Sequence, residues 1–189
     1  MLLSILIPSL TSRSEQFLSL KEELFRQIIE ANATEDVEVL DYIDSGEVSI
    51  GAKRNALKAI AKGEAGSYID DDDSISSTYI KRGLEFAKSG KDCASLRGVI
   101  TFDGDNPELF EHSIKYNEWR TNSTGPVKYE RFPNHLNFIS MDIIKQFDFP
   151  EINHGEDQDW STQIHKSGMI KSEYYIDETL YHYQYVSNK

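Results

Sequence analysis

The first apolar run of the sequence, Leu2-Leu3-Ser4-Ile5-Leu6-Ile7-Pro8, indicates what kind of sheet the chain forms. A continuous apolar run that ends at a proline is typical of a strand buried on both faces, as in a parallel sheet. Apolar residues then recur at helical spacing from Glu15 to about Asn32, and a second strand is expected over Val37 to Ile43. A strand, a helix and a strand in this order predict a parallel sheet covered by helices.

The same alternation continues along the chain. Gly51 to Lys62 has a helical pattern that Gly63 ends, and Ser67-Tyr68-Ile69 is a short strand that runs into Asp70 to Asp73. With no repeat or linker, we expect residues 1–189 to form one α/β domain. Residues 104–131 are mixed and polar and give no clear pattern. The other expected elements are a strand over 94–102, short helices over 142–147 and 157–166, and a closing strand within 173–185.

Composition limits the classes of function. The 189 residues are 39% hydrophobic, which is enough for a core, and their net charge of −12 disfavours nucleic acid as a partner. The single cysteine, Cys93, excludes an internal disulfide and a multi-cysteine metal site. No apolar stretch approaches the roughly 20 residues of a membrane span. The short apolar start has no basic flank before it, so we interpret it as a strand and expect a soluble, cytoplasmic protein.

Four adjacent carboxylates, Asp70 to Asp73, directly follow a short apolar strand. Ligands of open parallel sheets bind beyond the carboxyl ends of the strands. Because adjacent carboxylates repel one another and hard divalent metals prefer carboxylate oxygens, the cluster indicates a bound Mg²⁺ or Mn²⁺. The alternative is a solvated acidic loop that caps the next helix through Ser74 or Asp73.

Two further segments place polar groups at expected helix starts. Gly51 to Asn55 offers backbone N–H groups and basic side chains to an anion, although a basic helix surface explains this segment equally well. Gly155 to Trp160 contains adjacent carboxylates, one of which could act as a general base on a hydroxyl. His182 near the chain end is either structural or, if its strand returns to the acidic loop, a metal ligand.

The order of these segments resembles the GT-A nucleotide-sugar glycosyltransferases, in particular the family 2 enzymes. The resemblance spans residue 2 to about 185 and implies a Rossmann-like α/β fold with a mixed, mainly parallel sheet. It also implies a nucleotide-sugar-binding half over 1–100 and an acceptor and catalytic half over 101–189. The matching segments are Ser4-Ile5-Leu6-Ile7-Pro8, Gly51-Ala52-Lys53-Arg54-Asn55-Ala56, Tyr68-Ile69-Asp70-Asp71-Asp72-Asp73 and Gly155-Glu156-Asp157-Gln158-Asp159-Trp160.

The resemblance implies an inverting sugar transfer from a nucleotide-diphosphate donor, with UDP-sugar favoured, to a hydroxyl of a glycan or other small acceptor. Mn²⁺ or Mg²⁺ would be the cofactor. Asp157 would be the catalytic base and Glu156 would position the acceptor. The metal would be held by Asp72, Asp70 and His182. The residues implied to approach the donor nucleotide are Pro8, Ser9, Asp44 (or Asp41), Arg54, Asn55, Asp70 and Asp71.

The sequence departs from the family pattern and leaves two other functions open. The arginine that usually follows the Glu-Asp motif is missing, since residues 162–164 are Thr, Gln and Ile. A non-catalytic, divalent-metal-binding interaction module would also explain the acidic loop. A nucleotidyltransferase uses aspartates and metal on an α/β sheet as well, but residues 9–13 lack the glycine-rich signature expected there.

Overall fold

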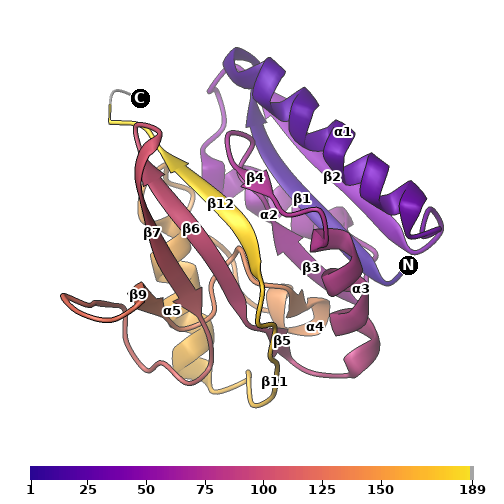
Figure 1. The fold of residues 1–189 in the computed structure, drawn as a ribbon. Helices are drawn as coiled ribbons and strands as arrows, with labels where there is room; N and C mark the ends of the chain where they lie inside the picture. The colour runs from indigo at the N-terminus through magenta and orange to yellow at the C-terminus, as the bar shows by residue number, and fades with distance from the viewer. Residues whose placement is uncertain (188–189) are drawn as a thin grey trace.

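Two six-stranded sheets form the framework of the protein in a computed structural model that describes residues 1–187 (Figure 1). The first sheet has the order β11 (Glu173–Tyr174), β5 (Cys93–Ala94), β10 (Ile139–Ser140), β3 (Ala65–Tyr68), β1 (Leu3–Leu10) and β2 (Val37–Asp44). The second has the order β4 (Ser74–Ile75), β12 (Thr179–Tyr185), β6 (Leu96–Phe102), β7 (Asp105–His112), β9 (Val127–Arg131) and β8 (Arg120–Thr121).

Strand β1 is a buried inner strand of the first sheet, as its apolar run predicts. It pairs in parallel with β2 on one side and β3 on the other. Its residues alternate between the two faces: Leu3, Ile5 and Ile7 belong to one core cluster, and Leu6 belongs to a second. All four side chains are fully buried, so both faces of the sheet are covered.

Helices cover both faces of the first sheet. The short 3₁₀ helix η1 (Thr11–Arg13) leads into α1 (Ser14–Glu30), which packs with α3 (Tyr79–Ser89) in the core cluster of Ile5. Helices α2 (Ile50–Ile60), α4 (Met141–Ile144) and α5 (Glu156–Ser167) contribute to the cluster of Leu6 on the other face. None of the helices in residues 1–187 is long and apolar enough to cross a membrane.

A second, mixed sheet extends the mixed, mainly parallel sheet that the sequence predicts. The strand expected over 94–102 is broken at Ser95, whose Oγ accepts a hydrogen bond from the Ile176 N–H at 2.7 Å. Beyond Ser95 the chain leaves the first sheet and enters the second, where β6 pairs with β12 in parallel and with β7 antiparallel. The unassigned segment 104–131 supplies β7, β8 and β9.

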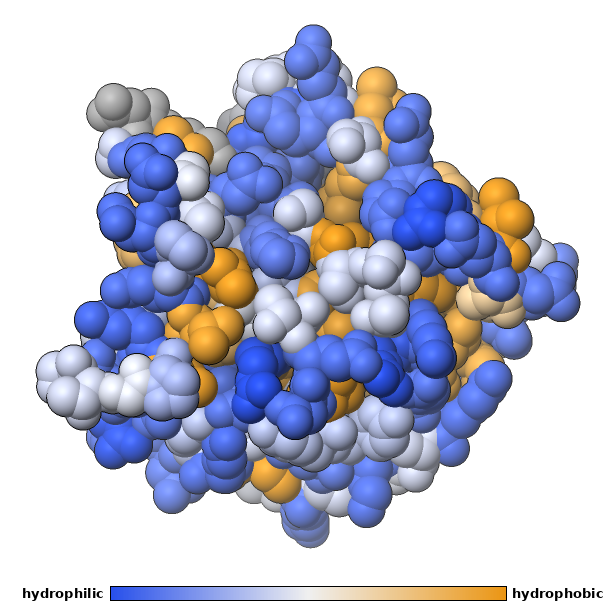
Figure 2. All heavy atoms as spheres, viewed as in Figure 1, coloured by the Kyte–Doolittle hydropathy of each residue, from blue (hydrophilic) through white to orange (hydrophobic). Residues whose placement is uncertain are grey.

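The surface agrees with the net charge of −12. Viewed as in Figure 1, the molecule is mostly hydrophilic, and its exposed apolar side chains form small separate patches (Figure 2). Arrangements of this kind are ordinary for globular proteins, so this face gives no indication of a large apolar interface.

Gly51 lets the start of α2 approach the segment that precedes α5. Its N–H donates to Ile152 O at 3.3 Å, and a Cβ at this position would lie 1.8 Å from the backbone oxygen of Pro150. We therefore expect Gly51→Ala to lower the free energy of unfolding by about 2–3 kcal/mol, because the backbone itself must move. Urea unfolding measures this loss.

Gly90→Ala is the matched control for Gly51→Ala. Gly90 has a φ of +67°, but nothing lies within 4 Å of the Cβ that alanine would add. Its loss of stability therefore comes from backbone conformation alone and should be the smaller of the two. If Gly51→Ala is the milder change, the close approach to Pro150 is not as tight as the structure shows.

Candidate active site

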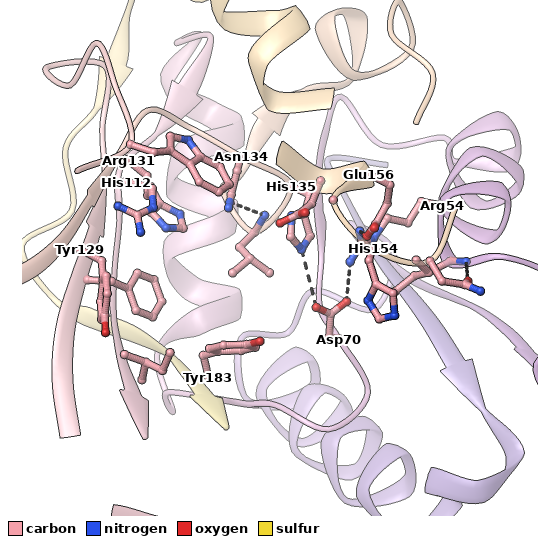
Figure 3. Close-up of a pocket in the computed structure, with 18 of the residues that line it drawn as sticks. Arg54, Asp70, His112, Tyr129, Arg131, Asn134, His135, His154, Glu156 and Tyr183 are labelled. Carbon is pink, nitrogen blue, oxygen red and sulfur yellow. Dashed lines mark hydrogen bonds and ion pairs between the residues drawn. The ribbon is translucent and has the colours of Figure 1, made fainter. Parts of the chain in front are cut away.

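Two adjoining cavities lie at the carboxyl ends of β1, β2 and β3, and Asp70 lines both. This is where ligands bind in open α/β sheets. We call the first the strand-end cavity; it has a volume of about 600 Å³ and its lining includes Pro8, Ser9, Arg13, Lys53, Asp71, Asp72 and residues 183–187. We call the second the aromatic cavity; it has a volume of about 470 Å³ and its lining includes Phe102, Phe110, Trp119, Tyr129, Tyr183, Arg131, His135 and Asp157 (Figure 3).

The four aspartates after β3 face different partners. Asp71 is buried and accepts hydrogen bonds from Ser9 Oγ (2.8 Å), the Leu10 N–H (2.9 Å) and Arg13 (2.9 Å). Asp71 therefore fixes the end of β1, and its carboxylate is occupied by this role. Ser9 and Pro8, which the family resemblance places near a donor nucleotide, line the strand-end cavity, and their contact with a nucleotide stays a prediction.

The carboxylate of Asp73 also has hydrogen-bond partners within the protein. It accepts hydrogen bonds from the Tyr181 hydroxyl at 2.8 Å and from the Gln184 N–H at 2.9 Å. Burial raises the pKa of Asp73 well above its ordinary value, and the charge of Asp70 adds to the effect. Asp73 thus ties the acidic loop to β12. Asp70 and Asp72 also line the strand-end cavity, where Asp70 pairs with Arg54 at 2.8 Å and Asp72 pairs with Arg13 at 3.2 Å.

Arg54 joins Asp70 to Glu156 in the floor of the site. Its side chain is buried, and it forms ion pairs with Asp70 at 2.8 Å and with Glu156. Burial opposes ionisation of Asp70, but the charge of Arg54, the neighbouring His135 and the hydrogen bond from Arg54 together outweigh it, and the pKa of Asp70 lies below its usual range. Arg54 and Glu156 are therefore part of the site, although they act first on each other and on Asp70.

Two of the predicted nucleotide contacts lie elsewhere. The Asn55 amide binds the backbone of Phe149 on both sides, donating to its oxygen at 2.9 Å and accepting from its N–H at 2.8 Å. Asn55 lines neither cavity, and its amide holds the segment that contains Phe149 against α2. Asp44 pairs with Lys53 and accepts from the N–H groups of Gly46 and Val48, so it shapes the loop that lines the strand-end cavity.

The start of α2 is also not open to an anion. The Ala52 N–H is capped by Ser49 Oγ at 3.3 Å, and the Ile50 N–H donates to Asn153 Oδ1 at 3.0 Å. With the bond from Gly51 described above, the N–H groups of the first turn are used within the protein. These backbone N–H groups are therefore not available to an anion, while the basic side chain of Lys53 lines the strand-end cavity.

His182 does not join Asp70 and Asp72. Side chains of a strand alternate between its faces, and on β12 it is Tyr181 that reaches Asp73 and Tyr183 that lines both cavities. His182 is exposed and lines neither cavity. The expected return of the C-terminal strand to the acidic loop is correct, but the register places the histidine on the opposite face.

Asp157 and an unpredicted histidine lie together in the aromatic cavity. Gly155, with a φ of +82°, begins α5 in the left-handed region, and Asp157 follows in the first turn with a side chain 31% exposed. His135 is buried, with Nδ1 3.8 Å from Asp157 and Nε2 3.7 Å from Asp70. Neither ring nitrogen has a hydrogen-bond partner. His135 thus lies within 4 Å of both carboxylates, and Figure 3 shows it beside Asp70.

The acidic loop provides two carboxylates for a divalent cation, which needs further ligands from a bound phosphate. Within residues 1–187 no three His, Cys, Asp or Glu side chains are grouped so that they could hold a metal ion. Mg²⁺, however, is usually held by one or two carboxylates together with substrate phosphates. Asp70 and Asp72 line the strand-end cavity and provide this pair of carboxylates. The residues therefore fit a cation that arrives with a phosphate ligand.

Comparison with known proteins gives a fold. The sequence matches no known family model and no curated protein. Among solved structures it resembles residues 1–349 of S. aureus TarS, with a TM-score of 0.63 and 15% identity over 97% of this chain. It also resembles this part of TarS in complex with UDP-GlcNAc, with a TM-score of 0.62 and 14% identity over the whole chain.

A third similar structure is the catalytic domain of Drosophila beta1,4-galactosyltransferase 7 in complex with xylobiose. Its TM-score is 0.57, with 11% identity over 95% of this chain. The chain has the GT-A fold. It spans 60% of the two TarS structures and 68% of the Drosophila domain. The fold class predicted from the sequence is confirmed, while membership of family 2 stays a prediction.

Proposed function

We propose that the protein is an inverting, metal-dependent, family 2-like glycosyltransferase that moves a sugar from a UDP-sugar to an acceptor hydroxyl. The observation that carries this proposal is the pair of cavities that meet at Asp70 on a GT-A fold, with Asp157 in the second cavity. Support for the donor class comes from TarS, which was solved with UDP-GlcNAc and with UDP. The order of the four sequence motifs supports the same function.

In the proposed reaction the nucleotide occupies the strand-end cavity and the acceptor occupies the aromatic cavity. Asp157 accepts the proton of the acceptor hydroxyl while that oxygen forms a bond to the anomeric carbon. The bond from this carbon to the diphosphate oxygen breaks on the opposite face, and UDP leaves with the electron pair. Arg54 holds Asp70 ionised and in place, and aromatic side chains such as Tyr183 exclude water.

Mn²⁺ or Mg²⁺ held by Asp70 and Asp72 would offset the charge of the departing diphosphate. The first test is therefore calorimetric titration with UDP, GDP and CMP, in Mn²⁺ and again in EDTA. We expect UDP to bind in Mn²⁺ and to bind at least tenfold more weakly in EDTA. The variant Asp72→Ala should lose affinity to a similar extent, since it removes one of the two carboxylates.

Asp142→Ala is the control, because Asp142 is exposed on α4 and lines neither cavity of the site. It should bind UDP as the wild type does. If no nucleotide binds while Mn²⁺ alone raises the melting temperature, the protein is a metal-binding module and the proposed transfer is wrong. If UDP binds equally well in Mn²⁺ and in EDTA, the proposed metal dependence is wrong, but the proposed donor class stands.

A further inference from the structure

Arg131 stands apart from the other arginines of the protein. Within residues 1–187 it is the one arginine that forms no ion pair, although the chain carries a net charge of −12. The six arginines with carboxylate partners are Arg13, Arg26, Arg54, Arg82, Arg97 and Arg120. An arginine without a carboxylate in so acidic a chain is a positive charge that the protein itself leaves uncompensated.

Arg131 is partly buried at the end of β9 and lines the aromatic cavity. Its guanidinium carbon lies 5.1 Å from the ring centre of Trp119 and 5.4 Å from that of Tyr129. Only Nη1 has hydrogen bonds, to the backbone oxygens of Arg120 (2.6 Å) and Glu130 (2.9 Å). Burial lowers the pKa of Arg131, yet an arginine stays protonated in proteins, so the cavity wall carries a desolvated positive charge.

His112 lies beside Arg131 because the two residues are paired in the register of β7 and β9. Burial lowers the pKa of His112 to about 3, so its ring is neutral at physiological pH and adds no second charge. His112 Nδ1 and Trp119 Nε1 are buried polar atoms without a hydrogen-bond partner. This end of the cavity therefore combines one unpaired cation with two unsatisfied polar groups, and buried groups of this kind normally have partners.

The position of Arg131 separates it from the donor side. Arg131 and His112 lie at one end of the aromatic cavity, and Asp70 and Arg54 lie at the other (Figure 3). Arg131 does not line the strand-end cavity, whereas Asp157 shares the aromatic cavity with it. A ligand held by Arg131 would thus extend from the proposed base away from the acidic loop.

We infer that the acceptor is anionic and that its carboxylate or phosphate group binds Arg131 while its hydroxyl faces Asp157. This inference rests on the proposed function and names the class of acceptor. Guanidinium binds both anions through paired N–H donors. The aromatic side chains beside Arg131 supply flat apolar surfaces against which the body of the acceptor packs.

The test measures acceptor binding directly, in the presence of Mn²⁺ and saturating UDP. The probes are methyl β-D-glucuronide for a carboxylate and glucose 6-phosphate for a phosphate, with methyl β-D-glucoside and glucose as their neutral counterparts. We expect one anionic probe to bind about 10- to 100-fold more tightly than its neutral counterpart, the size of a charged hydrogen-bonded contact. The probe that shows the difference identifies which anion the acceptor carries.

Arg131→Met should abolish this preference, because it keeps an apolar stem between the two rings and removes the charge. Arg131→Lys keeps the charge without the paired donors and should retain part of the preference for the anionic probe. Arg120→Met is the control, since Arg120 pairs with Glu130 on the neighbouring strand and lies outside the aromatic cavity. It should leave the preference unchanged.

Failure of the inference and failure of the proposed function appear in different titrations. If UDP binds but each anionic probe binds no better than its neutral counterpart, the acceptor is not anionic and the transferase proposal stands. This comparison uses the wild type and stays decisive even if Arg131→Met does not fold. A loss of UDP affinity in Arg131→Met equal to its loss for the probe would assign Arg131 to the donor and overturn the inference. If UDP does not bind the wild type, both proposals fall.

Discussion

Replacing Asp157 with Asn is expected to slow transfer by about 10²- to 10⁴-fold, the usual contribution of a general base. The amide keeps the size of the side chain but cannot accept the acceptor proton. UDP affinity should change by less than about twofold, because Asp157 lines the aromatic cavity and not the strand-end cavity. The rate is measured as UDP release from a UDP-sugar with the best acceptor probe, and the affinity by calorimetry.

Asp159→Asn is the matched control for this prediction. Asp159 lies in the same first turn of α5 and is exposed, and its carboxylate accepts a hydrogen bond from Gln163 at 2.9 Å. It lines neither cavity and should leave transfer near the wild-type rate. If Asp157→Asn turns over at a rate similar to Asp159→Asn, the base is another residue, and His135, whose Nδ1 lies 3.8 Å from Asp157, is the next group to examine.

The aspartates after β3 show how far the sequence leads. The sequence itself shows that carboxylates follow a buried strand, and because ligands bind beyond the carboxyl ends of such strands, it predicts a ligand site there. Which partner each carboxylate has depends on residues that are distant in the sequence. Asp71 turns to Ser9 on β1 and Asp73 turns to Tyr181 on β12, and these partners are 62 and 108 residues away along the chain. Asp70 and Asp72 pair instead with Arg54 and Arg13, and only the tertiary structure assigns each carboxylate its partner.

The histidines show the same limit. His182 was expected near the metal because the C-terminal strand returns to the acidic loop, and β12 does pair with β4 beside it. A shift of one residue exchanges the faces of a strand, so the sequence could not decide between His182 and its neighbours. His135 and Arg131 come from segments without a clear periodic pattern, and only the second sheet and the loop after β9 bring them to the cavity.

Arg54→Met is expected to lower the free energy of unfolding by about 3–5 kcal/mol at pH 7. The variant leaves the carboxylates of Asp70 and Glu156 in the floor of the site without their shared cation. Methionine fills much of the same volume, so the loss reports the charges more than a cavity. Urea unfolding at pH 7 measures it.

The pH dependence gives the second half of this prediction. In the wild type the pKa of Asp70 is held below its unfolded value, so the stability that its ion pair contributes is present at pH 7 and is lost as the pH falls through the acid range. Without Arg54, burial raises the pKa of Asp70, and the folded variant gains protons more readily than its unfolded chain. The gap in stability between wild type and variant should therefore narrow from pH 7 to pH 4.

Two comparisons separate the charge effect from a packing effect. Arg26→Met removes an arginine that pairs with Glu23 and Glu30 on the exposed face of α1, and it should change stability little at either pH. Arg54→Met combined with Glu156→Gln removes one of the two carboxylates that lack their cation, so it should recover part of the lost free energy of unfolding at pH 7. A gap that stays constant between pH 7 and pH 4 would mean that Arg54 supports the site by packing against Phe149, and not by holding Asp70 ionised.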